Sequence, residues 1–250
     1  MSAIAGLPLA RQGLETVAID MPTYGETKVA AGEKVRYDTW VELASDFIEH
    51  ERSRDRRPIF LYGLSAGGML IYHAAALNGH VAGIIGMTFL DQRVAHALIP
   101  LMGRLGIPMI HAAAHTPLAG MKMPMWLASK MHTLVNDKAA LKACTSAGNW
   151  ASLRFLSSYL SYAPTIEPEA FKVCPVLLTL PAADRWTPPT LSQPFLQRLR
   201  HVEVTTWLPD NAGHYPLEEP ALEKMNAAIL AFIQRTLTGS ECEFRSPDEP

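Results

Sequence analysis

The chain has 250 residues, with 22 Lys and Arg against 24 Asp and Glu, a formal net charge of -2, and 48% hydrophobic residues. This length and composition are typical of one globular domain with a sizeable core, and they exclude a disordered or collagen-like chain. The charge is balanced and the basic residues form no cluster. Nucleic acids and anionic membrane surfaces require concentrated positive charge, so neither is expected as a partner.

The cysteines and the apolar stretches indicate the compartment. Cys144, Cys174 and Cys242 show no C-x-x-C spacing, which excludes a zinc ribbon and argues against a disulfide framework. The amino terminus lacks a basic region followed by a sustained apolar run, and the strongest apolar stretch, residues 81–90, is too short to span a bilayer. We therefore expect a cytoplasmic protein without stable membrane insertion.

Short apolar or β-branched runs alternate with helical patterns along most of the chain. Five such runs predict strands at residues 16–20, 58–62, 82–89, 176–180 and 202–208. Continuous apolar runs of this length favour strands buried on both faces. Asp38 is expected to cap a helix after the first strand, and the last helix is expected to start near Pro220 and end before Gly239. The predicted class is α/β with a mainly parallel sheet and flanking helices.

One long segment breaks this alternation. Between residues 91 and 168 no strand is predicted, and helical spacing recurs, first at Met123, Leu127 and Met131 and then from Trp150, with Asn149 as the expected cap. We interpret residues 91–168 as a helical cap insertion between two core parts, 1–90 and 169–238, followed by a flexible polar tail at 239–250.

A motif with chemical meaning follows the second predicted strand. Residues 63–67 read G-L-S-A-G, which is a G-x-S-x-G pattern between a strand and a helical run. The turn is so tight that the residues flanking Ser65 need to be nearly free of side chains, and it lifts the hydroxyl above the carboxyl edge of the sheet. A serine in a Gly-rich turn is often only a turn residue, but this context favours a nucleophile.

A serine nucleophile requires a base and a carboxylate that orients the base. Asp184 lies just after the strand predicted at 176–180, and His214 lies on a Gly-preceded loop after the strand predicted at 202–208. The order Ser, Asp, His is the one expected when such groups meet at the carboxyl edge of this kind of sheet. Asp91, at the end of the third predicted strand, is a rival acid. The other interpretations are a turn-capping carboxylate at 184 and a surface histidine at 214.

Residues from about 14 to 237 resemble the α/β-hydrolase superfamily, and within it the capped, monoacylglycerol-lipase or serine-aminopeptidase-like group. Besides the motifs above, residues 20–25, D-M-P-T-Y-G, are similar to the family's D-x-P-G-x-G turn, with Thr23 in place of a glycine. Asp20 is expected to shape this turn. The resemblance implies that Ser65, Asp184 and His214 form a catalytic triad and that the Ala66 backbone N–H is one oxyanion-hole donor.

The activity expected from the resemblance is hydrolysis of a small-molecule carboxylic ester with an apolar acyl group, as in a lipase or esterase, without a cofactor or metal. The residues expected to line the substrate pocket are Leu64, Met123, Trp126, Leu127, Met131 and Trp186. Methionine-rich segments are also adaptable packing, and this alternative stays open. His111 and His115 are spaced like the ligands of metalloprotease helices, but no Glu adjoins the first, so a cap-lining or surface role is expected.

The amino-terminal region lacks one expected part. In the family, a further strand and a His-Gly-rich loop precede these elements and supply the second oxyanion-hole donor, but no His-Gly motif occurs before residue 16. We therefore expect an amino-terminally shortened hydrolase with weak or absent activity. Residues 16–20 should border a gap or pair directly with 59–62. The alternative function is a non-catalytic member of the fold that binds an apolar ligand or a partner.

Overall fold

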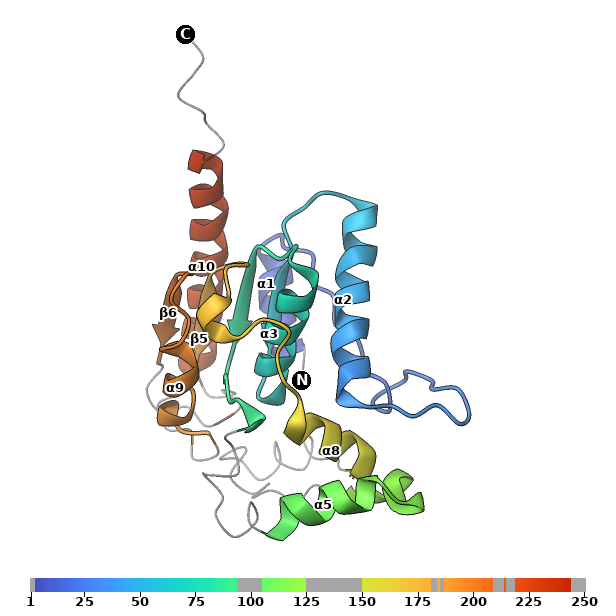
Figure 1. Cartoon of the computed structure of the whole chain (residues 1–250). Coiled ribbons are helices and arrows are strands. Elements are labelled where there is room, and N and C mark those ends of the chain that lie inside the picture. Colours follow the sequence, from blue (N-terminus) through green and yellow to red (C-terminus); the bar gives the residue numbers. More distant parts are fainter. Residues whose placement is uncertain are drawn as a thin grey trace.

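A four-stranded parallel sheet forms the centre of the molecule, and helices cover both of its faces (Figure 1). The computed structural model describes residues 3–93, 105–124, 150–180, 184, 187–208, 214 and 219–243. The helices and strands are, in chain order, α1 (Ala3–Arg11), α2 (Tyr37–Arg54), β1 (Phe60–Gly63), α3 (Ala66–Asn78), β2 (Gly83–Gly86), α5 (Ile107–Ala114), β3 (Lys122–Pro124), β4 (Trp150–Ser152), α8 (Leu153–Ser161), β5 (Val176–Thr179), α9 (Gln193–Leu196), β6 (Val204–Trp207) and α10 (Ala221–Glu243). Short 3-10 helices occupy Pro117–Gly120, Pro168–Ala170 and Pro189–Leu191.

The strand order in the central sheet is β1-β2-β5-β6, and each neighbouring pair is parallel. Gly63 lies opposite Gly86, Gly86 opposite Leu178, and Leu178 opposite Thr206, so the four strands end at one common edge. Four of the five predicted strands are confirmed, each shorter than its apolar run. The predicted α/β class with a parallel sheet is confirmed as well.

The two faces of the sheet carry separate apolar clusters. Ile84 and Val176 face a cluster that includes side chains of α2, α3 and α9. Ile85 and Leu177, the next residues along the same strands, face a cluster built from α1 and α10. Adjacent strand residues point to opposite faces. Burial on both faces is the physical reason that these strands read as continuous apolar runs.

The strand predicted at residues 16–20 is wrong. Residues 14–21 form neither helix nor strand, and Val17 is 54% and Ile19 38% exposed. The segment also does not pair with β1, whose ladder partner among the described residues is β2. A β-branched run becomes a strand only when a neighbour satisfies its backbone groups, and the described residues supply none here.

The turn that follows this segment is organised around Asp20, as expected. Its carboxylate accepts a hydrogen bond from the Glu26 backbone N–H at 3.0 Å, and its carbonyl accepts one from the Thr27 hydroxyl at 2.5 Å. Thr23 has a φ of 76°, the left-handed conformation that glycine adopts most readily. The similar turn pattern has a glycine at this position, and in this chain Thr23 adopts the left-handed backbone conformation instead.

The ends of two helices differ from the predictions. Asp38 lies in the first turn of α2, and the N-cap is Arg36, whose backbone N–H donates to the Thr39 hydroxyl at 3.2 Å. Helix α10 continues to Glu243, beyond the end predicted at Gly239. A glycine inside a helix costs about 1 kcal/mol, and packing of the apolar face against the sheet can outweigh that cost.

The segment predicted to be purely helical contains a small second sheet. β3 and β4 pair antiparallel, with Met123 opposite Ala151, so Met123 lies on a strand and Trp150 does not start a helix. Ser152 caps α8 by accepting a hydrogen bond from the Phe155 N–H at 3.1 Å. Asn149, the cap predicted from the sequence, lies outside the described residues. Strands of three residues are too short to produce a periodic pattern.

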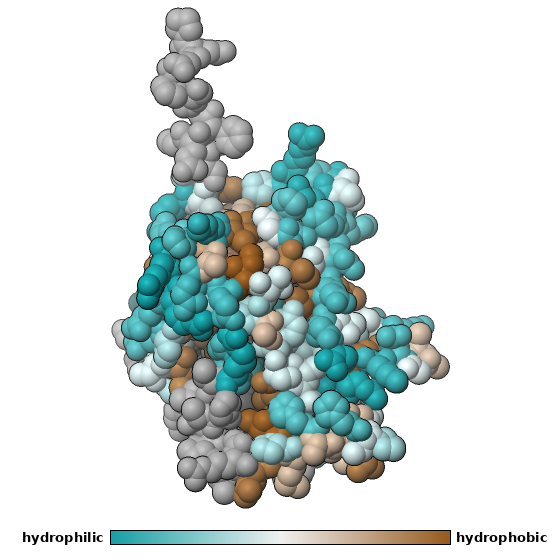
Figure 2. All heavy atoms as spheres, viewed as in Figure 1, coloured by the Kyte–Doolittle hydropathy of each residue, from teal (hydrophilic) through white to brown (hydrophobic). Residues whose placement is uncertain are grey.

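Helices α5 and α8 lie beyond the carboxyl ends of the central strands (Figure 1). α8 is fixed to the start of α2, where the Tyr37 backbone N–H donates to the buried Ser158 hydroxyl at 2.8 Å. Figure 2 shows hydrophobic side chains along the edge of the molecule where α5 lies. The exposed large apolar side chains of this region are Leu105, Met109, Leu118, Met121 and Trp150. No helix within the described residues has the length and apolarity of a membrane span.

Candidate functional site

Ser65 stands at the sharp reversal between β1 and α3. Its φ of 52° lies in the left-handed region that few residues other than glycine occupy, and such backbone positions concentrate at functional sites. The Gly67 N–H donates to the Leu64 carbonyl at 2.8 Å, which closes the turn. Ala66 is exposed and begins the helix, so its backbone N–H has no partner within α3 and can bind an anion.

Two glycines make this reversal possible. A Cβ at Gly63 would lie 2.2 Å from the Gly67 carbonyl oxygen, and a Cβ at Gly68 would lie 1.8 Å from the Thr88 carbonyl oxygen. A Cβ at Gly67 would meet nothing within 4 Å. The expectation of side-chain-free flanks therefore holds at Gly63 but not at Gly67. The second essential glycine is Gly68, which lies outside the five-residue motif and lets α3 approach Thr88, the second residue after β2.

We expect Gly68→Ala to lower the free energy of unfolding by about 1–3 kcal/mol, because the added methyl would force backbone atoms apart. Gly67→Ala is the matched control, and it should be neutral or slightly stabilising because alanine favours the helix. Urea unfolding of the two variants measures the difference. Equal losses of stability would contradict the close approach of α3 to Thr88.

Asp184 and His214 form a buried pair beyond the ends of β5 and β6. Their side chains are fully buried, and His214 Nδ1 lies 2.8 Å from Asp184 Oδ2. Thr187 donates its backbone N–H to Asp184 Oδ1 at 3.0 Å and its hydroxyl to Oδ2 at 2.8 Å. Burial acts to raise the pKa of Asp184, but the hydrogen bond and charge of His214 and the bonds from Thr187 hold that pKa below its ordinary value. The carboxylate is therefore ionised at neutral pH.

Thr88, just after β2, connects this pair to the rest of the edge. Its hydroxyl lies 3.0 Å from the Thr187 hydroxyl, which in turn lies 3.2 Å from His214 Nδ1. The Thr88 carbonyl is also the atom that Gly68 approaches. The residues that follow all four strands thus meet at one edge, with Ser65 just after β1 and Asp184 and His214 after the strands two and three positions away. Neither threonine was predicted from the sequence, although a threonine three residues after an aspartate suggests a side-chain turn.

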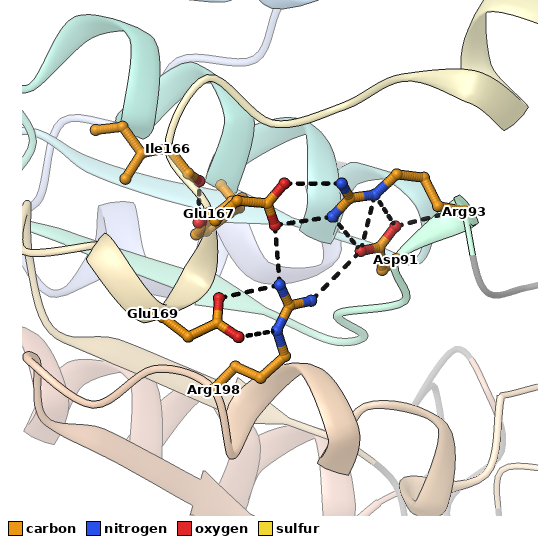
Figure 3. Close-up of polar contacts among 7 residues, drawn as sticks. Asp91, Arg93, Ile166, Glu167, Glu169 and Arg198 are labelled. Carbon is orange, nitrogen blue, oxygen red and sulfur yellow. Dashed lines mark hydrogen bonds and ion pairs between the residues drawn. The ribbon is translucent and has the colours of Figure 1, made fainter.

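Asp91, the rival acid, is bound by arginines (Figure 3). Its Oδ2 lies 2.7 Å from Arg93 Nη2 and 3.7 Å from Arg198 Nη1. Glu167 pairs with both arginines at 2.8 and 2.9 Å, and Glu169 pairs with Arg198 at 2.5 Å. Burial acts to raise the pKa of Asp91, but its bonds to Arg93 and the charges of both arginines hold it low. This geometry favours an ion-pair role for Asp91 and leaves Asp184 as the carboxylate that contacts His214.

The structure locates two of the residues predicted to line a substrate pocket. Leu64 is half-buried and directly precedes Ser65. Met123 is half-buried and packs against the apolar cluster formed by the start of α2 and by α8. For this methionine the structure therefore favours packing, the alternative to a pocket-lining role. The other four predicted pocket residues, Trp126, Leu127, Met131 and Trp186, lie outside the described residues. The apolar pocket therefore stays a prediction.

The two histidines with metalloprotease-like spacing belong to α5 and its end. His111 Nδ1 lies 2.8 Å from the Ser157 hydroxyl of α8, so this side chain links the two helices. His115 is the C-cap of α5. In the described part of the chain, no group of three or more His, Cys, Asp or Glu side chains is placed to hold a metal ion.

Comparison with known proteins adds a family match. Residues 2–227 match the model of the alpha/beta hydrolase family. A search of curated proteins finds no match to this chain.

Several solved structures share the fold at low sequence identity. Monoacylglycerol lipase from Paleococcus ferrophilus is 19% identical, with 81% of this chain and 76% of that chain covered and a TM-score of 0.58. A soluble variant of monoglyceride lipase from Saccharomyces cerevisiae, in complex with a substrate analogue, is 17% identical (87% and 76% covered, TM-score 0.64). Est1E from Butyrivibrio proteoclasticus, with ferulic acid bound, is 16% identical (94% and 82% covered, TM-score 0.59).

Proposed function

Because the chain belongs to the alpha/beta hydrolase family, we propose that it is a serine hydrolase in which Ser65 is the nucleophile, His214 the base and Asp184 the acid. The observation that carries this proposal is the buried pair of His214 Nδ1 and Asp184 Oδ2 at 2.8 Å, on the sheet edge where Ser65 occupies its strained turn. A buried carboxylate and imidazole are a poor source of stability, so their position on the same sheet edge as the serine turn supports a chemical role.

The proposed reaction has two halves. With Nδ1 donating to Asp184, neutral His214 accepts the Ser65 proton at Nε2 while the serine oxygen attacks the ester carbonyl carbon. The resulting oxyanion accepts a hydrogen bond from the Ala66 N–H. Its collapse breaks the bond to the alcohol, which leaves with the proton from Nε2. Water then gives a proton to His214, attacks the acyl-enzyme and releases the carboxylic acid, and Ser65 recovers its proton.

We assign the substrate to carboxylic esters with an apolar acyl group. Five large apolar side chains on residues 105–121 and at Trp150 are each more than half exposed. They belong to the part of the chain around α5 and α8, which lies beyond the sheet edge that carries the site (Figure 1). An apolar surface of this kind favours an apolar ligand. Two of the structural neighbours are named monoacylglycerol or monoglyceride lipases. A cap formed by residues 91–168, with a pocket that includes Trp126, is part of the same proposal.

The test uses a fluorophosphonate probe, which reacts covalently with an activated serine. We expect the wild-type protein to be labelled and Ser65→Ala to show no labelling. Rates on p-nitrophenyl esters of increasing acyl length then test the substrate class, with faster cleavage expected for longer apolar chains. A folded wild-type protein without labelling would contradict the hydrolase proposal, and a flat chain-length profile would contradict the apolar pocket.

A second function is kept because of one observation at β1. The segment at residues 14–21 does not pair with β1. Within the described residues, no strand therefore lies next to β1 on the side opposite β2, where a loop after such a strand could supply a second oxyanion donor. Loss of one such donor costs about a hundred- to a thousandfold in turnover. The alternative is therefore a non-catalytic protein that binds an apolar ligand. It predicts binding of a fluorescent fatty acid without fluorophosphonate labelling.

A further inference from the structure

The described surroundings of Asp184 contain a threonine pair, Thr88 and Thr187, that the proposed mechanism leaves without a task. Both side chains are buried, at 3% and 7% exposure, and their hydroxyl groups lie 3.0 Å apart. They come from loops after different strands, β2 and β5, and are 99 positions apart in the chain. A buried hydroxyl is costly unless it is hydrogen-bonded, so the arrangement of these protons can be worked out atom by atom.

Resting on the proposed function, we propose that Thr187, held in place by Thr88, is a positioning residue that fixes the Asp184 carboxylate against His214. Thr187 reaches both carboxylate oxygens, with its backbone N–H on Oδ1 at 3.0 Å and its hydroxyl on Oδ2 at 2.8 Å. Two contacts to two oxygens stop the carboxylate from rotating about its own axis. Oδ2 is thereby held 2.8 Å from His214 Nδ1.

The direction of each hydrogen bond follows from the number of protons. An ionised carboxylate only accepts, so the one hydroxyl proton of Thr187 points to Asp184 Oδ2. The Thr187 oxygen must then accept from Thr88, which makes the Thr88 hydroxyl the donor across the 3.0 Å contact. Thr88 therefore acts on the carboxylate only through Thr187, and this chain of donors strengthens each bond in it.

The same oxygen also faces the imidazole. Thr187 Oγ1 lies 3.2 Å from His214 Nδ1 and can accept from it, as Oδ2 does. Both neighbours of Nδ1 are acceptors, which favours the tautomer with the proton on Nδ1 and leaves Nε2 as the base.

The central variant is Thr187→Val, which keeps the shape and the backbone N–H but removes the hydroxyl. A hydrogen bond to a charged group contributes enough that we expect kcat to fall about ten- to a hundredfold, with KM little changed. Without this donor the charge of Asp184 is less well stabilised, so the Asp184–His214 pair binds a proton more tightly and the acidic limb of the kcat/KM profile should move to higher pH. Thr187→Ser, which retains the hydroxyl, should have a kcat and a pH profile close to those of the wild type.

Thr88→Val tests the relay. It should lower kcat less than Thr187→Val, by about two- to fivefold. The double variant should be no slower than Thr187→Val alone, because Thr88 reaches the carboxylate only through Thr187. If the two losses of kcat multiply in the double variant, Thr88 does not act through Thr187.

Ser192→Ala is the matched structural control. Ser192 is fully buried, and its hydroxyl accepts a hydrogen bond from the Phe89 backbone N–H at 3.1 Å, so it also joins the loops after β2 and β5. No contact of Ser192 with Asp184 or His214 is described. This variant should lower the melting temperature without moving the pH profile. If Ser192→Ala shifts the pH profile as Thr187→Val does, the threonine effect comes from weaker packing between the loops after β2 and β5, and the proposal is wrong.

A proton NMR measurement separates this inference from the hydrolase proposal. The His214 Nδ1 proton should give a downfield signal in the wild-type protein, assigned by its loss in His214→Ala, and Thr187→Val should shift or broaden it whether or not the protein turns over ester. An unchanged signal, or unchanged kcat and pH profile in a protein that labels at Ser65, would overturn the role of Thr187. Failure of wild-type labelling with a shifted signal would instead overturn the proposed function alone.

Discussion

Ser65→Ala is expected to lower the turnover of a p-nitrophenyl ester about a million-fold, and His214→Ala by a similar amount, because nucleophile and base act as one unit. Neither group can replace the other: without the hydroxyl no acyl-enzyme forms, and without the imidazole the hydroxyl keeps its proton. The variant that lacks both groups should therefore be little slower than either single variant.

The measurement is steady-state hydrolysis by each variant, with far-ultraviolet circular dichroism to establish that the fold is retained. Ser65 is half-buried and makes few described contacts, so its truncation should leave stability almost unchanged. If Ser65→Ala kept about a tenth of wild-type turnover, the covalent mechanism would be wrong. Losses that multiply in the double variant would show that the two side chains act separately.

Asp184→Asn is expected to reduce turnover about ten-thousand-fold while the fold persists. The amide carries no charge to stabilise the imidazolium, and its NH₂ group can donate to His214 Nδ1, which places the histidine proton on the wrong nitrogen. The comparison is Asp91→Asn, measured in the same assay. The Asp91 carboxylate is bound by Arg93, so its replacement should have much less effect on turnover.

Asp91→Asn should act on stability instead. The folded protein lowers the pKa of Asp91, so its contribution to stability is present above the pKa of an unfolded aspartate and is lost as the pH falls through the folded value. The difference in melting temperature between Asp91→Asn and the wild type should thus be largest near neutral pH and shrink in acid. A larger effect on turnover at Asp91 than at Asp184 would move the acid to the end of β2.

The success of the strand predictions depended on what each run packs against. The runs that became β2 and β5 are fully buried between the two apolar clusters, and those that became β1 and β6 are partly buried against the same clusters, so their apolar character reflected the environment they occupy. Residues 16–20 have the same local character but no ladder partner among the described residues, and single-sequence patterns carry no information about partners. The pairing of β3 with β4 was missed for the same reason.

The candidate site divides in a similar way. Ser65, Asp184 and His214 could be singled out because each follows a predicted strand and their order in the chain fits one sheet edge. Gly68 and Thr88 could not, because their importance comes from a close approach between the start of α3 and the loop after β2. Such contacts arise only when distant segments are brought together, and they leave no spacing rule in the sequence.

The ion pairs in Figure 3 have a consequence for how the chain can vary. Arg93 Nη1 and Glu167 Oε1 lie 2.8 Å apart although 74 positions separate the two residues. An ion pair therefore joins the residue after β2 that begins this segment to the residue that ends it. Doubling the length of a closed loop adds only about 0.6 kcal/mol of chain entropy. Changes in the length of that segment should thus leave the pairing of β2 with β5 unchanged.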